Sequence, residues 1–340
     1  MTALYDARGN RYVVASPSTL RSLGINISQN AELAAATRKV WAEEAVSALC
    51  HWPPGQRPEN AKEHRCDGLL IGPFQETSSP FDLLIVNTDG TLAERSGNGL
   101  TIFSQALTDS GQIGTTTPFM LRVHHDHSSS PSPVATMVTP DTRQGLPGFW
   151  LDIGTPAFGP EAVQAKRSGM IENAQGNVQF TGVKLLIGLD PRWCLSVFVR
   201  IGNPHCVTLV PEAEALPGFR QLHEQPLHDA LAHIAFAEGA HSDGDPFASG
   251  VNLQWAAMSS ANTLIAKVFE RGEGPTASSG TSACAVAAAA WLAGWVSGGM
   301  VDVVMPGGSA PVNLIENDGN LVQIVLFGTA SRLDDFTLTP

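Results

Sequence analysis

The fold of this chain is decided by the stretch ERGEGPTASSGTSAC, which runs from Glu270 to Cys284. The apolar segment 261–269 before it predicts a strand, and the Ala-rich run 285–290 after it predicts a helix. The first-turn N–H groups of a helix have no partner within the helix, and the helix dipole favours negative charge there. The stretch therefore predicts a pocket for a carboxylate or a phosphate beside the hydroxyl of Ser279.

The same design appears once more, far upstream. FDLLIV (Phe81–Val86) predicts a buried strand, NTDG (Asn87–Gly90) a turn, and SGNG (Ser96–Gly99) a second helix start. Two similar helix starts predict two similar halves. If those halves face each other, Ser96 and Ser279 flank one small acid that is bound by two helix N-termini.

The composition is that of a globular protein whose partner is a small molecule. With 340 residues, 43% of them hydrophobic and 15% charged, the chain is long enough for two domains with cores. The formal charge of -12 argues against nucleic acid and against a membrane surface as the main partner. No apolar run reaches the roughly 18 residues of a membrane span, and residues 1–20 lack the features of a signal peptide, so we expect a cytoplasmic protein.

Neither the cysteines nor the histidines predict a metal site. The five cysteines are odd in number and lack paired spacing, so we expect buried free thiols and neither disulfides nor zinc. His124, His125 and His127 lie beside Asp126, which raises the alternative of a metal site. We expect a solvated loop instead, because alternate residues of a strand face opposite ways and the following SSSPSP is typical of a linker.

The order of the elements predicts an α+β fold, because there are many strands, few helices and no regular alternation of strand and crossover helix. Ala31–Cys50 predicts one amphipathic helix, Gly9-Asn10 a tight turn, and Ile201–Cys206 a sharp turn between two strands. Within that last turn, His205 has two readings, as an acid or base and as a structural histidine whose ring binds backbone groups. The structural reading is favoured.

Each serine at a helix start has a structural reading as an N-cap and a functional reading beside a bound acid. An N-cap requires neither a glycine-rich segment before the helix nor the preceding Glu270-Arg271. It also does not require that the same pattern occur at two helix starts, so the pair of serines favours the functional reading. We find no Gly-x-Ser-x-Gly motif, and no His or Asp is identifiably placed to activate either hydroxyl. Hydrolase chemistry therefore has little support.

Several separate motifs resemble the signatures of the diaminopimelate epimerase family. The main ones are NTDG followed by ERSGNG, the turn GNPHC at 202–206, and ERG followed by SGTSAC at 279–284. GN at 9–10, VN at 251–252 and PGG at 306–308 fit in the same order. The resemblance is specific, because several motifs agree in both sequence and spacing, and it covers most of the chain.

The resemblance implies two pseudo-symmetric halves, each a β-barrel-like sheet around a central helix, with the active site in the cleft between them. The halves are expected at residues 1–147 with 329–340 and at 148–328. It also implies inversion at the α-carbon of an amino-acid substrate without any cofactor, one residue removing the proton and its opposite number delivering another. The oligomeric state is not readable from the pattern, with which a homodimer is compatible.

The resemblance also implies roles for the residues that match the family's motifs. Ser96 and Ser279 match the two acid/base positions. Arg271 would pair with a distal carboxylate, and Glu270 would attract an ammonium group. Four asparagines would supply neutral hydrogen bonds: Asn10, Asn87, Asn203 and Asn252. The α-carboxylate would be held by the first-turn N–H groups of Gly97, Asn98, Gly280 and Thr281.

The two serines depart from the family, in which both acid/base positions are cysteines. A thiol with a pKa of about 8.5 between two helix dipoles spends useful time deprotonated near pH 7, whereas a plain serine does not readily do so. Three explanations stay open: serines introduced to trap a ligand, a different reaction such as that of a lyase or isomerase, and amino-acid binding without turnover. We expect an epimerase or racemase scaffold with low activity in this chain.

Two smaller departures concern the substrate. His64–Gly68 stands where the family has a glycine-rich segment, and Pro275 replaces a usual Glu. Diaminopimelate is therefore one candidate among amino acids with a polar far end.

Overall fold

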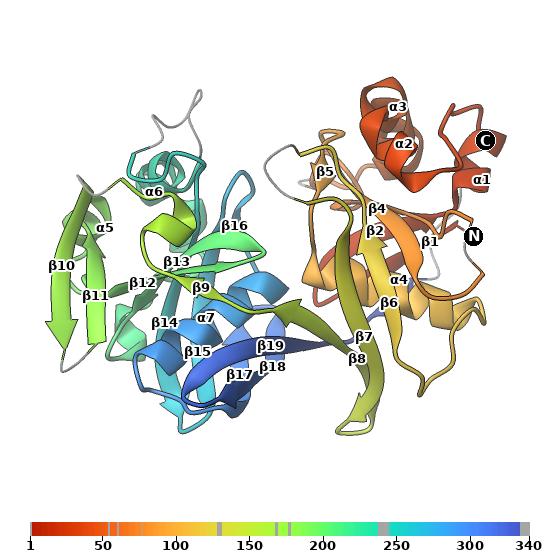
Figure 1. The fold of residues 1–340 in the computed structure, drawn as a ribbon. Helices are drawn as coiled ribbons and strands as arrows, with labels where there is room; N and C mark the ends of the chain where they lie inside the picture. Colours follow the sequence, from red (N-terminus) through yellow and green to blue (C-terminus); the bar gives the residue numbers. More distant parts are fainter. Residues whose placement is uncertain are drawn as a thin grey trace. The chain divides into compact units, whose positions relative to one another are not determined.

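The computed structural model describes residues 2–53, 55–59, 61–75, 77–127, 131–166, 169–175, 178–236 and 245–333 (Figure 1). These residues form two compact units, one drawn from Met1–Leu151 with Phe327–Pro340 and the other from Asp152–Leu326. The chain therefore passes from one unit to the other twice. Residues 329–340 are expected in the first half, and residues 334–340 of that segment lie outside the described part.

The first unit contains short and long strands together with four described helices. The helices are α1 (Pro17–Ser22), α2 (Ala31–Ala36), α3 (Arg38–Cys50) and α4 (Gly97–Asp109). The strands are β1 (Thr2–Ala7), β2 (Asn10–Ala15), β3 (Gly68–Ile71), β4 (Phe81–Asn87), β5 (Leu92–Ala93), β6 (Phe119–Val123), β7 (Val134–Arg143), β8 (Leu146–Gly154), whose last residues belong to the second unit, and β20 (Ser331–Leu333).

The second unit is built in the same manner. Its strands are β9 (Ala157–Phe158), β10 (Met170–Gln175), β11 (Val178–Val183), β12 (Ser196–Ile201), β13 (Asn203–Leu209), β14 (Asn252–Ser260), β15 (Thr263–Glu270), β16 (Gly274–Thr276), β17 (Gly299–Met305), β18 (Gly308–Asn317) and β19 (Asn320–Gly328), whose last two residues belong to the first unit. Its helices are α5 (Lys184–Leu189), α6 (Leu227–Ala235) and α7 (Gly280–Leu292), with short 3₁₀ turns at Glu161–Val163, Ala213–Ala215 and Gln221–His223.

The order of strand pairing is the same in both units. In the first, β1 and β2 form an antiparallel hairpin, β2 is parallel to β3, β3 is antiparallel to β4, and β4 pairs with β5 and, in parallel, with β6. In the second, β12 to β17 repeat these pairings in the same order and with the same directions. Antiparallel strands follow in each, β7 and β8 in one and β18 and β19 in the other. The result is a mixed α/β protein with a long sheet.

A buried helix occupies the equivalent place in each repeat, after the hairpin β4–β5 or β15–β16. Helix α7 is buried from Gly280 to Ala290 and contacts β12 to β15, β17 and β18. Its run of alanines lets these strands pack close to the helix axis. Helix α4 is buried over most of its length and contacts β1, β2 and β20.

Two local expectations from the sequence were wrong. The single helix expected at 31–50 is interrupted at Thr37, whose φ of -104° and ψ of 16° are not helical and whose Oγ1 donates to the Leu33 carbonyl at 2.7 Å. A threonine hydroxyl competes for the carbonyls that propagate a helix. The turn expected at 201–206 is reduced to Gly202, whose φ is 69°, because Asn203 already begins β13.

Among the described residues, no helix is both long enough and apolar enough to cross a membrane.

Gly328 provides a test of how tightly α4 packs in the first unit. A Cβ at Gly328 would lie 2.8 Å from Cγ2 and 3.0 Å from Cβ of Thr101, and closer still to its Oγ1. Thr101 is 1% exposed and its hydroxyl donates to the Gly97 carbonyl at 2.9 Å, so it cannot move without losing that bond. We expect Gly328→Ala to lower the free energy of unfolding by about 1–3 kcal/mol, measured by urea denaturation.

The matched control is Gly188→Ala in helix α5. Nothing lies within 4 Å of a Cβ at Gly188, so the change should be neutral or stabilising by about 0.5–1 kcal/mol. Equal destabilisation by both substitutions would contradict the packing argument.

Candidate active site

Helix α4 begins with a serine cap. Ser96 has an extended backbone, with φ -142° and ψ 118°, and its Oγ accepts the N–H of Gly99 at 3.0 Å. A Cβ at Gly99 would lie 3.1 Å from the Ser96 Cβ and 3.3 Å from Cδ2 of Leu70, so this turn packs closely against β3. By helix geometry, the N–H groups of Gly97 and Asn98 have no partner within the helix.

Helix α7 begins in almost the same way. Ser279 has φ -146° and ψ 118°, and its Oγ accepts the N–H of Ser282 at 3.4 Å. Each helix is 13 residues long and starts with a glycine. Ser279 is 5% exposed, whereas Ser96 is half-buried. The N-cap role expected of the serines is therefore present in both units.

In the first unit, two of the predicted substrate contacts lie at one edge of the sheet. Asn10 begins β2 and Asn87 ends β4, and the ladder that joins Tyr12, Gly68 and Asn87 brings these strand ends to the same edge. Asn10 Nδ2 donates to Asp67 Oδ2 at 3.1 Å. Asn87 Nδ2 donates to Thr91 Oγ1 at 2.9 Å. These hydrogen bonds fix the orientation of both amide groups.

In the second unit, the corresponding edge carries Asn203, Asn252, Glu270 and Arg271. Asn203 begins β13 and Asn252 begins β14, and Glu270 ends β15. The pairings His205 with Asn252 and Leu253 with Phe269 place these ends together.

Arg271 is anchored at this edge by two hydrogen bonds. Its N–H donates to Asn252 Oδ1, and its Nη1 donates to the carbonyl of Ser249, both at 2.8 Å. These contacts hold the guanidinium beside the start of β14. They also give Asn252 a positioning role that the sequence alone does not reveal.

The structure thus gathers the predicted site residues of each unit by two devices, a sheet edge and a helix start. In the first unit Asn10 and Asn87 share the edge, and Ser96, Gly97 and Asn98 form the helix start. In the second unit the edge set is Asn203, Asn252, Glu270 and Arg271, and the helix start is Ser279, Gly280 and Thr281. In both units the first turn of the helix contacts the third residue of the equivalent strand, through Leu70 in β3 and Gln254 in β14.

Gln254 is a site residue that the sequence analysis missed. Its Nε2 contacts Nδ1 of His205 and Oγ of Ser282, each at 3.0 Å. Gln254, His205 and Ser282 are all fully buried, so this network lies directly beneath the first turn of α7. The signal in the sequence was a glutamine within an otherwise apolar strand, because a buried amide must be hydrogen-bonded.

His205 lies in strand β13 and not in a turn, which corrects the sequence-based placement. Burial, with a smaller contribution from the nearby charge of Arg271, lowers its pKa to about 3. The ring is therefore neutral at physiological pH, with Nδ1 accepting from Gln254. This environment supports the structural reading of His205.

The loop at 124–127 was expected to be solvated, which is wrong for His124 and His125, whereas Asp126 and His127 are exposed. His124 and His125 are 7% and 5% exposed. His124 Nε2 lies 2.9 Å from Asp82 Oδ1, and Arg122 donates two hydrogen bonds of 2.7 Å to the same carboxylate. His124 packs inward because this buried carboxylate needs cationic or hydrogen-bonding partners.

The described residues form neither a cluster of metal ligands nor a disulfide bond. No group of three or more His, Cys, Asp or Glu side chains there is arranged to hold a metal ion. All five cysteines are free thiols; four are buried, whereas Cys194 is half-exposed and not buried as expected.

The chain is similar to diaminopimelate epimerases. The family model described as diaminopimelate epimerase matches residues 197–333. Diaminopimelate epimerase 2 of Nostoc sp. (strain PCC 7120) is 28% identical over 312 residues, which cover 91% of this chain and 87% of that protein. The diaminopimelate epimerase of Burkholderia thailandensis is 31% identical over 222 residues, 65% of each chain.

Solved structures share the fold at low sequence identity. A probable proline racemase from Agrobacterium radiobacter K84, with bound carbonate, aligns with a TM-score of 0.58 at 13% identity and covers all of this chain and 93% of its own. A phenazine biosynthesis protein of the PhzF family from Bacillus anthracis aligns with a TM-score of 0.57 at 10% identity over 98% of this chain and 96% of its own.

The neutral His205 predicts how stability depends on pH. In the unfolded chain a histidine binds a proton below a pKa of about 6.5, whereas the folded protein binds it only near pH 3. The unfolded state therefore gains protons first as the pH falls, and His205 contributes a loss of about 1.4 kcal/mol per pH unit at most between pH 6 and pH 4.

The measurement is urea unfolding of the wild type and of His205→Asn from pH 8 to pH 4. Above pH 7 the difference between the two proteins should not change with pH. Below pH 6 the difference should shrink as the pH falls. A constant difference down to pH 4 would show that His205 has the same pKa in the folded and the unfolded protein, which contradicts the lowered pKa.

Proposed function

We propose that this chain, which is similar to diaminopimelate epimerases, is an isomerase of the epimerase or racemase type that inverts the α-carbon of a free amino acid without a pyridoxal cofactor. The observation that carries this proposal is the pair of equivalent helix starts, with matching backbone angles at Ser96 and Ser279 in two units of the same topology. The halves, 1–147 with 329–340 and 148–328, would enclose the substrate in a cleft between them.

In the proposed reaction the α-C–H bond breaks on one face and a new one forms on the other. The group at one helix start takes the proton, the electron pair is delocalised into the α-carboxylate, and the opposite group returns a proton. The N–H groups of Gly97, Asn98, Gly280 and Thr281 would bind that carboxylate, where developing negative charge is stabilised by both helix dipoles.

The remaining residues would orient the substrate. The guanidinium of Arg271, fixed by Asn252 and Ser249, suits a distal carboxylate, and Glu270 at the end of β15 suits the ammonium group. The amides of Asn10, Asn87, Asn203 and Asn252 would supply neutral hydrogen bonds at the two sheet edges. An amino acid with a polar far end fits this set.

The serine hydroxyls set a limit on the rate. Each Oγ accepts a helix N–H, so the hydroxyl is a neutral cap. If the pKa of the base is one pH unit above that of a thiol, forming its reactive anion costs about 1.4 kcal/mol more free energy. We therefore propose that this chain has low activity as it stands.

A second candidate is favoured by the same serines. A protein that binds an amino acid in this cleft needs the two helix N-termini but no base of suitable pKa. A lyase or isomerase that removes one proton without returning it to the other face is the remaining alternative.

The test is the double variant Ser96→Cys/Ser279→Cys, incubated in deuterated water with single amino acids that include diaminopimelate. We expect deuterium at the α-carbon and inversion of configuration, at rates about 10²–10⁴ times those of the serine protein, because a thiolate replaces a neutral hydroxyl. Exchange is followed by mass spectrometry and inversion by chiral chromatography.

The matched control is Ser104→Cys, which places a thiol within the same helix but beyond its first turn. It should leave exchange unchanged. Tight binding without exchange by the double variant would favour the binding protein, and release of a keto acid or an unsaturated product would favour the lyase. A screen for thermal stabilisation by amino acids would identify the ligand class beforehand.

A further inference from the structure

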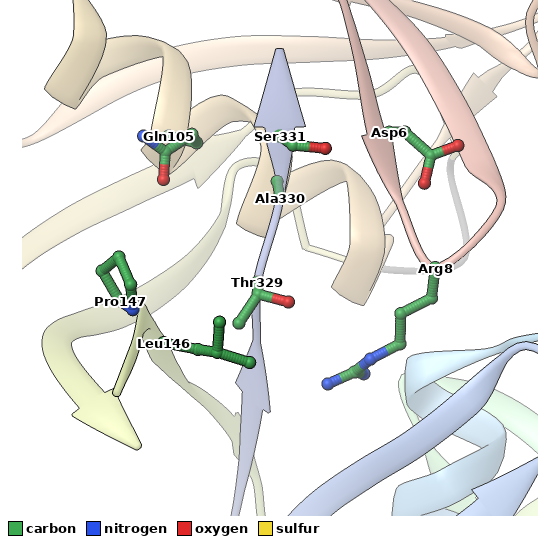
Figure 2. A pocket seen from close by; sticks show the side chains of 8 residues that line it. All are labelled: Asp6, Arg8, Gln105, Leu146, Pro147, Thr329, Ala330 and Ser331. Carbon is green, nitrogen blue, oxygen red and sulfur yellow. The ribbon is translucent and has the colours of Figure 1, made fainter. Parts of the chain in front are cut away.

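The first unit contains a cavity of about 340 Å³ that none of the predicted site residues lines. Figure 2 shows its walls, which come from the β1–β2 hairpin, helix α4, the start of β8 and residues 329–331, where β20 begins. The lining residue from α4 is Gln105, nine residues beyond Ser96 and therefore about 13 Å along the helix axis. The cavity is thus separate from the first turn of α4.

Arg8 is the cation of this cavity. It occupies the two-residue turn between β1 and β2 with Gly9, and both residues have positive φ, 56° and 85°. A tight turn of this kind leaves the backbone of Arg8 little freedom, so the side chain starts from a fixed position. Its Nη2 donates to the Phe327 carbonyl at 2.9 Å, which holds the guanidinium at the cavity.

No carboxylate among the described residues neutralises Arg8. Its one hydrogen bond in this part of the structure is to a neutral carbonyl, and no ion pair within 4.0 Å involves it there. Burial lowers its pKa to about 10, so it remains charged at neutral pH. A partly desolvated guanidinium with unused donors is suited to a planar carboxylate, which it can bind through two parallel hydrogen bonds.

Two hydroxyls accompany Arg8 in the cavity wall. Thr329 and Ser331 both line it, and neither hydroxyl has a hydrogen-bond partner within the described ranges. Figure 2 shows Arg8 and Thr329 directed toward the same space. These hydroxyls can donate to the oxygens of a carboxylate that Arg8 binds.

The negative group of the cavity is Asp6. Its Oδ1 accepts the N–H of Gly9 at 2.9 Å, and its Oδ2 forms an ion pair with Arg11 Nε at 3.2 Å on the exposed side chain of Arg11. A carboxylate offers about four acceptor positions, so Asp6 retains capacity for another donor. A phosphate dianion would be repelled by Asp6, whereas a zwitterion presents an ammonium to Asp6 and a carboxylate to Arg8.

We propose that this cavity is a second binding site, which takes a free α-amino acid through its carboxylate on Arg8 and its ammonium on Asp6. The volume lies at the small end of ligand pockets, which agrees with a ligand of this size. Leu146 and Pro147 supply an apolar wall for a short side chain. The site is independent of the proposed reaction, because it shares no residue with it.

The test uses 2-aminoisobutyrate, an amino acid that has no α-hydrogen and cannot be epimerised. Isothermal titration calorimetry of the full chain should show binding, and Arg8→Gln should weaken it about 10- to 100-fold because a charge-assisted hydrogen-bond pair is lost. Thr329→Val, which preserves shape, should weaken it about 3- to 10-fold. Arg220→Gln, on an exposed arginine of the second unit, should leave this binding unchanged.

The ammonium contact is tested with isobutyrate, which has the same shape without the amino group. The wild type should prefer 2-aminoisobutyrate, and Asp6→Asn should abolish that preference. Unchanged binding in Arg8→Gln and Thr329→Val, or tighter binding of inorganic phosphate than of 2-aminoisobutyrate, overturns the proposal. If Arg8→Gln fails to fold, as judged by its thermal midpoint without ligand, the Thr329 and Asp6 variants decide the question.

Discussion

Two helices of this protein begin inside it, and the first-turn N–H groups of both need partners there. A buried N–H without a partner costs as much as a lost hydrogen bond, so the surroundings of the two helix starts are constrained. One N–H in each is satisfied by the serine at the N-cap, Ser96 or Ser279. The others are the groups that make a helix start a binding site for an acid. The need to satisfy these buried N–H groups therefore constrains the residues that surround the starts of α4 and α7.

The repetition of strand pairing explains why two such helix starts exist. Each repeat begins with a β-hairpin, whose second strand pairs in parallel with a third strand. A fourth strand pairs antiparallel with the third and is followed by a short antiparallel strand, and then by the buried helix. The same sheet edge therefore carries polar residues in both units, Asn10 and Asn87 in one and Asn203, Asn252 and Glu270 in the other. A repeated topology thus supplies two similar sets of hydrogen-bonding groups from one folding pattern.

The units differ in what supports the helix start. In the first unit the contact to the sheet is apolar, through Leu70 against Gly99. In the second it is a buried polar network of Gln254, His205 and Ser282. Such a network fixes geometry only if its members stay hydrogen-bonded, and it requires a neutral His205. The first unit instead concentrates buried charge elsewhere, where Asp82 binds Arg122 and His124.

The sequence by itself determined those features that are encoded by a few adjacent residues. Glycine-rich turns, serines before apolar helices and apolar runs predicted both helix starts, the strands that precede them and the family resemblance, because each depends on a few adjacent residues. Long apolar runs such as 81–86 were also predicted, since a strand buried on both faces has few alternatives.

Tertiary structure alone decided the rest. It placed His205 in a buried strand, drew His124 and His125 inward to Asp82 and Pro131, joined Gln254 to residues about 30 and 50 positions away, and formed the Arg8 cavity from four separated segments. The physical reason is that a buried polar group is specified by its partners, and those partners come together only when distant segments pack.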